Sequence, residues 1–174
     1  MNRQKGDTVA RWYPLAESDD NTFRTARFLI RHVVDVPAPA ERVWQVLSAD
    51  DALVSWSKLI TGAEWTSPRP FGVGTTRTVT VGGVAALRER FYRWDENERM
   101  TFSAEAASRP GFRRFAEDLT LIPDADRTRL CWTFAVDAAP WLVPVLSSSR
   151  FLLHRVTGGW ADGLASRVGK EIRR

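Results

Sequence analysis

The fold of this chain is decided by residues 139–170, which read APWLVPVLSSSRFLLHRVTGGWADGLASRVGK. At helical spacing this stretch carries one stripe that is apolar except for a serine: Leu142, Leu146, Ser149, Leu153, Val156, Trp160, Leu164 and Val168. A helix of this length would extend about 45 Å, enough to cross a small domain. The pattern predicts a long amphipathic C-terminal helix, in which the serines at 147–149 mark a local start or bend.

Before this helix, seven short segments alternate apolar and polar residues, as strands with one buried face do. They are residues 27–36, 60–67, 73–81, 84–94, 99–107, 113–122 and 127–136. Two short helices are expected after the first strand, over residues 39–48 and from Asp50 onward. One long helix after many antiparallel strands predicts an α+β fold, in which a curved sheet wraps around the helix.

The register between strands tests whether the assigned faces belong together, because residues directly opposite each other lie on the same side of a sheet. A tight turn after the fourth strand sets Phe91 opposite Phe102. A plain two-residue turn between the third and fourth strands would join the wrong faces. We therefore predict an irregular turn over residues 82–84, which sets Arg77 opposite Glu89.

Length and local composition predict one domain with an N-terminal extension. A chain of 174 residues is large enough for one buried core, which we assign to residues 27–170. Residues 1–26 are polar and aperiodic, which predicts an arm. Its small cluster of Trp12, Tyr13 and Leu15 is expected to order it partly by docking, and a flexible tail is the alternative.

The composition excludes several classes of protein. No apolar run is long enough to span a membrane, and the first residues lack the apolar core of a secretory signal, so we expect a cytoplasmic protein. A single cysteine allows no intramolecular disulfide and no cysteine-rich zinc site. The net charge of +4 comes from dispersed arginines, which indicates a solvated surface and no nucleic-acid partner.

Four segments carry a resemblance to a known family. They are VVDVPAPAERVWQVLSADDALVSW at 33–56, GVGTTRTV at 72–79, LRERFYRWDENERMTFSA at 87–104 and TRLCWTF at 128–134. With the order of elements, they make the chain similar to the START-like superfamily, also called helix-grip or birch-pollen-allergen-like. Within it, the chain most resembles the polyketide cyclase/dehydrase group.

This resemblance covers about residues 27–168 and implies a seven-stranded antiparallel sheet around the C-terminal helix, with a hydrophobic cavity between them. Relatives bind lipids, sterols, polyketides, plant hormones or quinones, and some catalyse cyclisation or dehydration of a bound polyketide. The resemblance implies a small hydrophobic molecule as the partner, and the sequence contains no cofactor-binding loop, so we expect no cofactor.

Three charged residues lie on strand faces expected to point inward, where a lone charge is costly. Arg77 opposite Glu89 is the natural ion pair, which would be either a polar anchor for a ligand or a structural salt bridge. Glu117 lies between apolar neighbours, where desolvation would raise its pKa and suit it to general acid work. Glu117, Glu89 and the inward-facing His32 are therefore the candidate catalytic residues.

The second histidine, His154, lies beside the stripe of the long helix, and we consider it a ligand contact or an acid–base group. Two histidines without a close acidic cluster predict no metal site. Aromatic side chains complete the candidate ligand contacts, together with Arg77 and His154. They are Trp56, Phe71, Phe91, Phe102, Phe115, Trp132, Trp141 and Trp160, any of which would fill a solid core equally well.

Three functions follow from these features: binding of a small hydrophobic molecule, a polyketide cyclase or dehydrase that uses a pocket carboxylate or histidine, and an interaction domain without a ligand. A purely apolar cavity with the charged side chains turned to water would favour the first. A cavity with a carboxylate beside a histidine would favour the second, and a filled interior the third. The sequence is compatible with a monomer or a homodimer.

Overall fold

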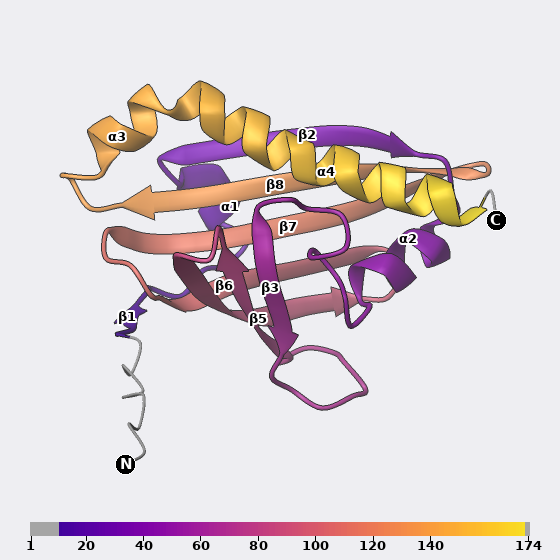
Figure 1. Cartoon of the computed structure of the whole chain (residues 1–174), viewed down its shortest axis with the longest axis horizontal. Coiled ribbons are helices and arrows are strands. Elements are labelled where there is room, and N and C mark those ends of the chain that lie inside the picture. The colour runs from indigo at the N-terminus through magenta and orange to yellow at the C-terminus, as the bar shows by residue number, and fades with distance from the viewer. Residues whose placement is uncertain (1–10, 173–174) are drawn as a thin grey trace, which may run out of the picture.

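The computed structural model describes residues 11–172, and a strongly curved antiparallel sheet dominates it (Figure 1). The seven main strands follow the order β2-β8-β7-β6-β5-β4-β3, and β1 pairs with β6 outside this path. The strands are β1 Tyr13–Pro14, β2 Phe28–Val36, β3 Ile60–Trp65, β4 Thr76–Val81, β5 Ala85–Asp95, β6 Arg99–Ala107, β7 Phe112–Asp124 and β8 Arg127–Ala138. The helices are α1 Thr22–Thr25, α2 Ala40–Leu47, α3 Val143–Ser148 and α4 Arg150–Ile172.

Helix α4 crosses one face of the sheet beside β2, and α2 lies near its C-terminal end (Figure 1). This arrangement is the helix-grip fold that the sequence predicted. The expected stripe does face inward, and its C-terminal members Leu164 and Val168 are fully buried in the core. Among the residues that the structure describes, no helix combines the length and the hydropathy needed to cross a membrane.

The predicted register between β4 and β5 is confirmed. Arg77 lies opposite Glu89, and a three-residue turn at 82–84 joins the strands. Gly82 and Gly83 have φ values of +60° and +68°, a left-handed conformation that glycine adopts without strain.

The pairing of β5 with β6 also keeps the predicted partners, but by a different route. The turn between these strands has three residues instead of two, and Asn97 within it has a φ of +66°. A bulge between Phe91 and Arg93 takes up the extra residue, so Phe91 still lies opposite Phe102.

Two helical segments differ from the expectation. The predicted helix over 139–170 is divided at Ser149 into α3 and α4, in agreement with the local start that the three serines indicated. In place of a second short helix after Asp50, residues 50–56 form consecutive turns. Leu53 has a φ of +69°, which a regular right-handed helix does not contain, so the segment keeps single helical hydrogen bonds, such as Ser55 N–H to the Asp51 carbonyl oxygen over 3.1 Å, without forming a helix.

The N-terminal arm runs along the sheet from residue 11 onward, while residues 1–10 lie outside the described part of the chain. β1 pairs Tyr13 with Ala107 at the end of β6, beyond the part of β6 that pairs with β7. The Arg88 guanidinium of β5 lies 4.1 Å from the centre of the Trp12 ring, and this cation–π contact is a second link between the arm and the sheet.

Glycine allows α4 to approach the turns at 50–56, which offers a test of the packing. A Cβ added at Gly163 would lie 2.5 Å from the backbone oxygen of Trp56, whereas one added at Gly159 would meet nothing within 4 Å. Because overpacking outweighs the gain in helix propensity, we expect Gly163→Ala to lower the free energy of unfolding by about 1–2 kcal/mol. Urea denaturation measures this change.

The matched control is Gly159→Ala, four residues earlier on the same helix. With no clash to offset the gain in helix propensity, it should raise the free energy of unfolding by up to about 1 kcal/mol. Equal stability of the two alanine variants would contradict a tight contact between α4 and the 50–56 turns.

Candidate functional site

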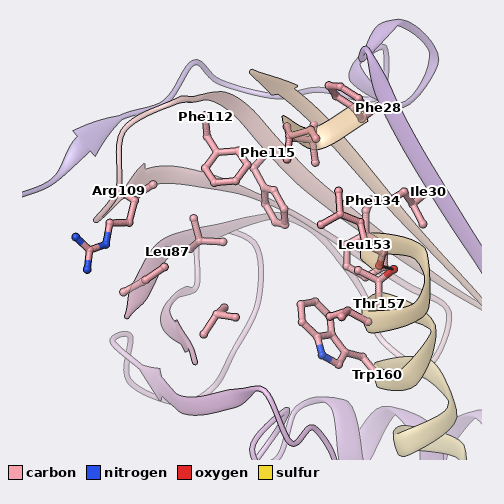
Figure 2. Close-up of a pocket in the computed structure, with 17 residues that line it drawn as sticks. Phe28, Ile30, Leu87, Arg109, Phe112, Phe115, Phe134, Leu153, Thr157 and Trp160 are labelled. Carbon is pink, nitrogen blue, oxygen red and sulfur yellow. Dashed lines mark hydrogen bonds between the residues drawn. The ribbon is translucent and has the colours of Figure 1, made fainter. Parts of the chain in front are cut away.

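A cavity of about 260 Å³ lies between the sheet and the N-terminal half of α4 (Figure 2). The side chains that α4 contributes to the packed hydrophobic core come from its C-terminal half, so the cavity and the core lie under different halves of this helix. The residues that line the cavity are Phe28, Ile30, Val81, Ala85, Ala86, Leu87, Ala107, Arg109, Phe112, Phe115, Phe134, Val136, Leu146, Leu153, Val156, Thr157 and Trp160.

The sheet side of this cavity follows from strand alternation and register. On β2, Phe28 and Ile30 are two residues apart and therefore point to the same face. They lie opposite Val136 and Phe134 of β8, which places four apolar side chains on one wall. Figure 2 shows Leu87 on the sheet facing the helix side of the cavity.

Among the described lining residues, Arg109 and Thr157 have polar side chains, and Trp160 carries an indole N–H that is buried and makes no hydrogen bond. Arg109 is exposed, its guanidinium points away from the aromatic cluster in Figure 2, and its Nε donates a hydrogen bond to the carbonyl oxygen of Val84 over 2.8 Å. The Thr157 hydroxyl lies 2.9 Å from the Leu153 carbonyl oxygen and 2.7 Å from Nε2 of His32. The cavity wall is therefore almost wholly hydrocarbon.

The predicted residue His32 lies behind Thr157 and is not itself a lining residue. The Thr157 hydroxyl has a single proton, which it donates to the Leu153 carbonyl oxygen, so it accepts from His32 Nε2–H. Burial and the nearby His154 ring, centred 4.5 Å away, lower the pKa of His32, while Asp162 opposes this shift. A neutral imidazole that holds its proton on Nε2 fits this environment.

His154, the second predicted histidine, is exposed and borders an open surface pocket with His32 and Asp162, outside the main cavity. Within residues 11–172, histidine, cysteine and acidic side chains nowhere gather in a group of three that could hold a metal ion. The two histidines are thus brought together, but on the outer side of the seam between α4 and β2.

The charged candidates form a separate cluster inside the closed core. The Glu89 carboxylate accepts hydrogen bonds from Nε and Nη2 of Arg77 over 2.9 and 2.6 Å, and both side chains are buried. Three aromatic rings surround the guanidinium, with centres 5.0–5.2 Å from it: Trp65, Phe91 and Phe102. Neither Arg77 nor Glu89 lines the cavity.

Glu117 belongs to the same cluster and accepts a hydrogen bond from Nε1 of Trp132 over 2.8 Å. Burial, and next the charge of Glu89, raise the pKa of Glu117 to about 8. Burial also raises the pKa of Glu89, while the ion pair with Arg77 opposes that rise. The cluster therefore combines the Arg77–Glu89 ion pair with an acid, Glu117, that stays largely protonated at neutral pH, and Glu117 is not a lining residue either.

The predicted aromatic contacts divide among several environments. Phe115 and Trp160 line the cavity. Phe91, Phe102 and Trp132 pack in the solid core. All five point into the interior, four from strands and Trp160 from α4. The sequence pattern therefore did not distinguish residues of the packed core from residues of the cavity wall.

The other three predicted aromatics lie elsewhere. Phe71 stacks on Trp65 with ring centres 4.4 Å apart. Trp56 borders an open groove beside α4, and Trp141 is an exposed side chain.

Several cavity residues were absent from the predicted contacts, above all Phe28, Phe112 and Phe134. Phe28 and Phe134 do occupy inward positions of the predicted strands, so the signal that could have found them is present. Alternation does not tell which part of α4 an inward residue faces. Residues near the start of β2 and the end of β8 face the N-terminal half of α4, where the cavity lies.

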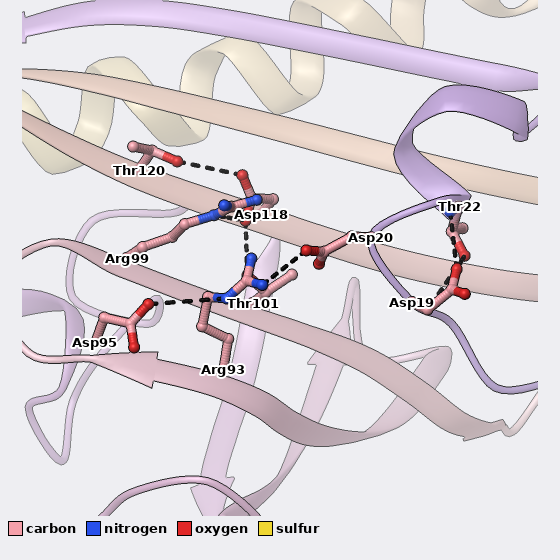
Figure 3. A network of polar contacts seen from close by, with 9 residues as sticks. All are labelled: Asp19, Asp20, Thr22, Arg93, Asp95, Arg99, Thr101, Asp118 and Thr120. Atoms are coloured by element: carbon pink, nitrogen blue, oxygen red, sulfur yellow. Dashed lines mark hydrogen bonds and ion pairs between the residues drawn. The ribbon is translucent and has the colours of Figure 1, made fainter.

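A further polar network lies away from the cavity and fastens the N-terminal arm (Figure 3). Asp20 of the arm forms an ion pair with Arg93 of β5 over 2.7 Å. Beside it, Asp118 accepts hydrogen bonds from Nε of Arg99 and the hydroxyl of Thr101, each over 2.7 Å. Every acid named here has a cationic partner, so this network serves to hold the arm on the sheet.

Comparison with known proteins places these features in a family. Residues 27–169 match the family described as polyketide cyclase/dehydrase and lipid transport. The chain is 35% identical over 142 residues to uncharacterized proteins of Mycobacterium bovis and Mycobacterium tuberculosis, a match that covers 82% of this chain and 85% of each relative.

Solved structures share the fold at lower identity. A protein of Thermus thermophilus superimposes with a TM-score of 0.70 at 20% identity, covering 83% of this chain and 99% of its own. A START superfamily protein of Mycobacterium smegmatis gives 0.63 at 19%, with 82% and 97% covered. A Streptomyces aromatase/cyclase gives 0.59 at 17%, with 78% and 93% covered.

The raised pKa of Glu117 predicts how stability changes with pH. The folded state keeps a proton that the unfolded state releases above its ordinary pKa of 4.5, so folding becomes less favourable as pH rises from about 4.5 to about 8. We expect Glu117→Gln to remove this loss, which is at most about 1.4 kcal/mol per pH unit for one proton. Urea denaturation at several pH values measures the slope.

The control is Glu105→Gln, which removes a surface carboxylate paired with Arg90 on the neighbouring strand. This variant should keep the pH dependence of the wild type. If Glu117→Gln and the wild type lose stability in parallel as pH rises, Glu117 is ionised in the folded protein and the assignment of a neutral acid is wrong.

Proposed function

The chain belongs to the polyketide cyclase/dehydrase and lipid transport family, and on this basis we propose that it binds a small hydrophobic molecule in the cavity beneath α4. The observation that carries the proposal is the hydrocarbon wall of an unfilled space inside an otherwise packed domain. Packed interiors leave few voids larger than a water molecule, and apolar voids of this kind take up apolar molecules.

The size of the cavity limits the ligand. Its volume of about 260 Å³ lies between an engineered apolar cavity of ~150 Å³, which binds benzene, and the ~300–1,000 Å³ of common ligand pockets. A compact ligand, such as a fused pair of aromatic rings or a medium-length acyl chain, suits this space.

The chemistry of the wall limits the ligand further. A charged group inside it would lose its hydration without gaining a partner, which is costly. Arg109 on the rim offers a charge-assisted hydrogen bond to an oxygen at the outer end of the ligand. We therefore propose an uncharged, mostly hydrocarbon body that carries at most a terminal polar group.

The placement of the acid–base candidates supports binding over catalysis. A catalytic acid or base has to reach the reacting group directly or through one water molecule. Glu117 and Glu89 are held by Trp132 and Arg77 inside the core, and His32 is directed to the hydroxyl of Thr157. The unfilled space likewise supports a ligand over the alternative of an interaction domain with a solid interior.

Filling the cavity tests the proposal. Val136 lines it from β8, so Val136→Phe should weaken binding of the neutral fluorescent probe N-phenyl-1-naphthylamine by about tenfold, because the added ring takes the place of the ligand. A fluorescence titration measures the dissociation constant, and native mass spectrometry of the purified wild type identifies any hydrophobic molecule that it carries.

Val33→Phe is the matched control, because Val33 lies on the opposite face of β2 and is exposed. It adds the same atoms outside the cavity and should leave probe binding unchanged. A thermal melt of both variants confirms that they are folded, and Leu87→Phe provides a second cavity variant if Val136→Phe is unstable. Undiminished probe binding by a folded cavity variant would overturn the proposed site.

A further inference from the structure

Large apolar side chains are exposed where the C-terminal helices begin. We name this the outer α3–α4 surface, and its members with their exposed fractions are Trp141 (62%), Val145 (54%), Phe151 (81%) and Leu152 (59%). Scattered single apolar residues are normal on a protein surface, whereas several large ones within one short stretch of chain indicate an interaction site. Trp141 lies in the turn before α3, Val145 in α3, and Phe151 and Leu152 at the start of α4, at one end of the molecule (Figure 1).

The charge on the segment that carries this surface has one sign, although Asp162 borders the next open pocket together with Arg155. The sequence from Ala138 to Ala161 contains no acidic residue, whereas it contains Arg150 and Arg155, both exposed on α4. Leu152 and Arg155 also border the open groove beside α4, whose opposite side carries Lys58. The groove therefore extends the same combination of apolar and cationic side chains.

The inner side of the same helices belongs to the cavity. Leu146 of α3 and Leu153 and Val156 of α4 line it, and Leu153 directly follows the exposed Leu152. A partner on the outer α3–α4 surface would therefore lie on the other side of the helical wall that encloses the cavity.

We propose that the outer α3–α4 surface docks on an anionic lipid membrane. Aromatic and aliphatic side chains insert at the boundary between headgroups and acyl chains, and arginines beside them are attracted to anionic lipids. Trp141 is of the residue type that is enriched at this boundary. Docking is peripheral and places the helical wall of the cavity against the source of hydrophobic molecules.

A second copy of this chain fits the surface less well. A symmetric dimer through the surface would bring Arg150 and Arg155 of one copy toward the same arginines of its partner, with no acidic residue on this segment to compensate. An anionic membrane supplies the opposite charge, so charge complementarity favours a membrane over a second copy on the outer α3–α4 surface.

Vesicle flotation tests the proposal without any cavity ligand, so its outcome is independent of the proposed binding function. The wild type should float with phosphatidylcholine vesicles that contain phosphatidylglycerol, and less with phosphatidylcholine alone. The double variant Phe151→Ser/Leu152→Ser should bind about tenfold more weakly, because it removes two inserted side chains. Arg150→Gln/Arg155→Gln should abolish the preference for phosphatidylglycerol.

Val73→Ser is the matched control, since Val73 is 72% exposed on the loop before β4, away from the surface. It should float like the wild type. Absence of vesicle binding by the wild type, or equal binding by the double serine variant, would overturn the proposal. A dimer in analytical ultracentrifugation that the double serine variant dissociates would also overturn it, because a second copy would then occupy the surface.

Discussion

The buried ion pair between Arg77 and Glu89 is the constraint on which the rest of the interior depends. Two charges removed from water are tolerated only when they contact each other with good geometry and their remaining polar atoms are satisfied. The contact requires β4 and β5 to be in one register, which the three-residue turn at 82–84 provides. A shift of β5 by one residue would turn Glu89 to the other face together with the apolar side chains of that strand, and it would leave Arg77 buried without its partner.

The same cluster explains why the interior has two different halves. Arg77, Glu89 and the neutral Glu117 are surrounded by tightly packed aromatic rings, which keep water away and hold each partner in place. A space that opens to admit a ligand would undo this packing and leave a buried charge with an incomplete set of partners. The solid half under the end of α4 thus houses the charges, and the cavity under its beginning is hydrocarbon.

The sequence predicts which residues face inward from the strands, but it does not predict at which position along α4 each of them packs. Alternation placed Phe91 and Phe115 on the inward face alike, and strand pairing could be derived from turn lengths and like faces. Whether an inward ring fills the core or lines the cavity depends on where α4 comes close to the rest of the domain. That distance is set by contacts such as Gly163 against the backbone of Trp56, which join segments far apart in the sequence.

The helical wall of the cavity is held less firmly than its sheet wall. On the sheet side, its walls are strands joined by continuous ladders, and each hydrogen bond broken without a replacement would cost about 1 kcal/mol or more. On the helix side, the wall consists of α3 and the first turns of α4, which contribute side chains such as Leu146 and Leu153 without backbone pairing to the sheet. The break at Ser149 divides this wall into two separate helices. Displacing the helical wall therefore breaks side-chain contacts but no backbone pairing with the sheet. The outer side of this same wall carries the exposed apolar side chains.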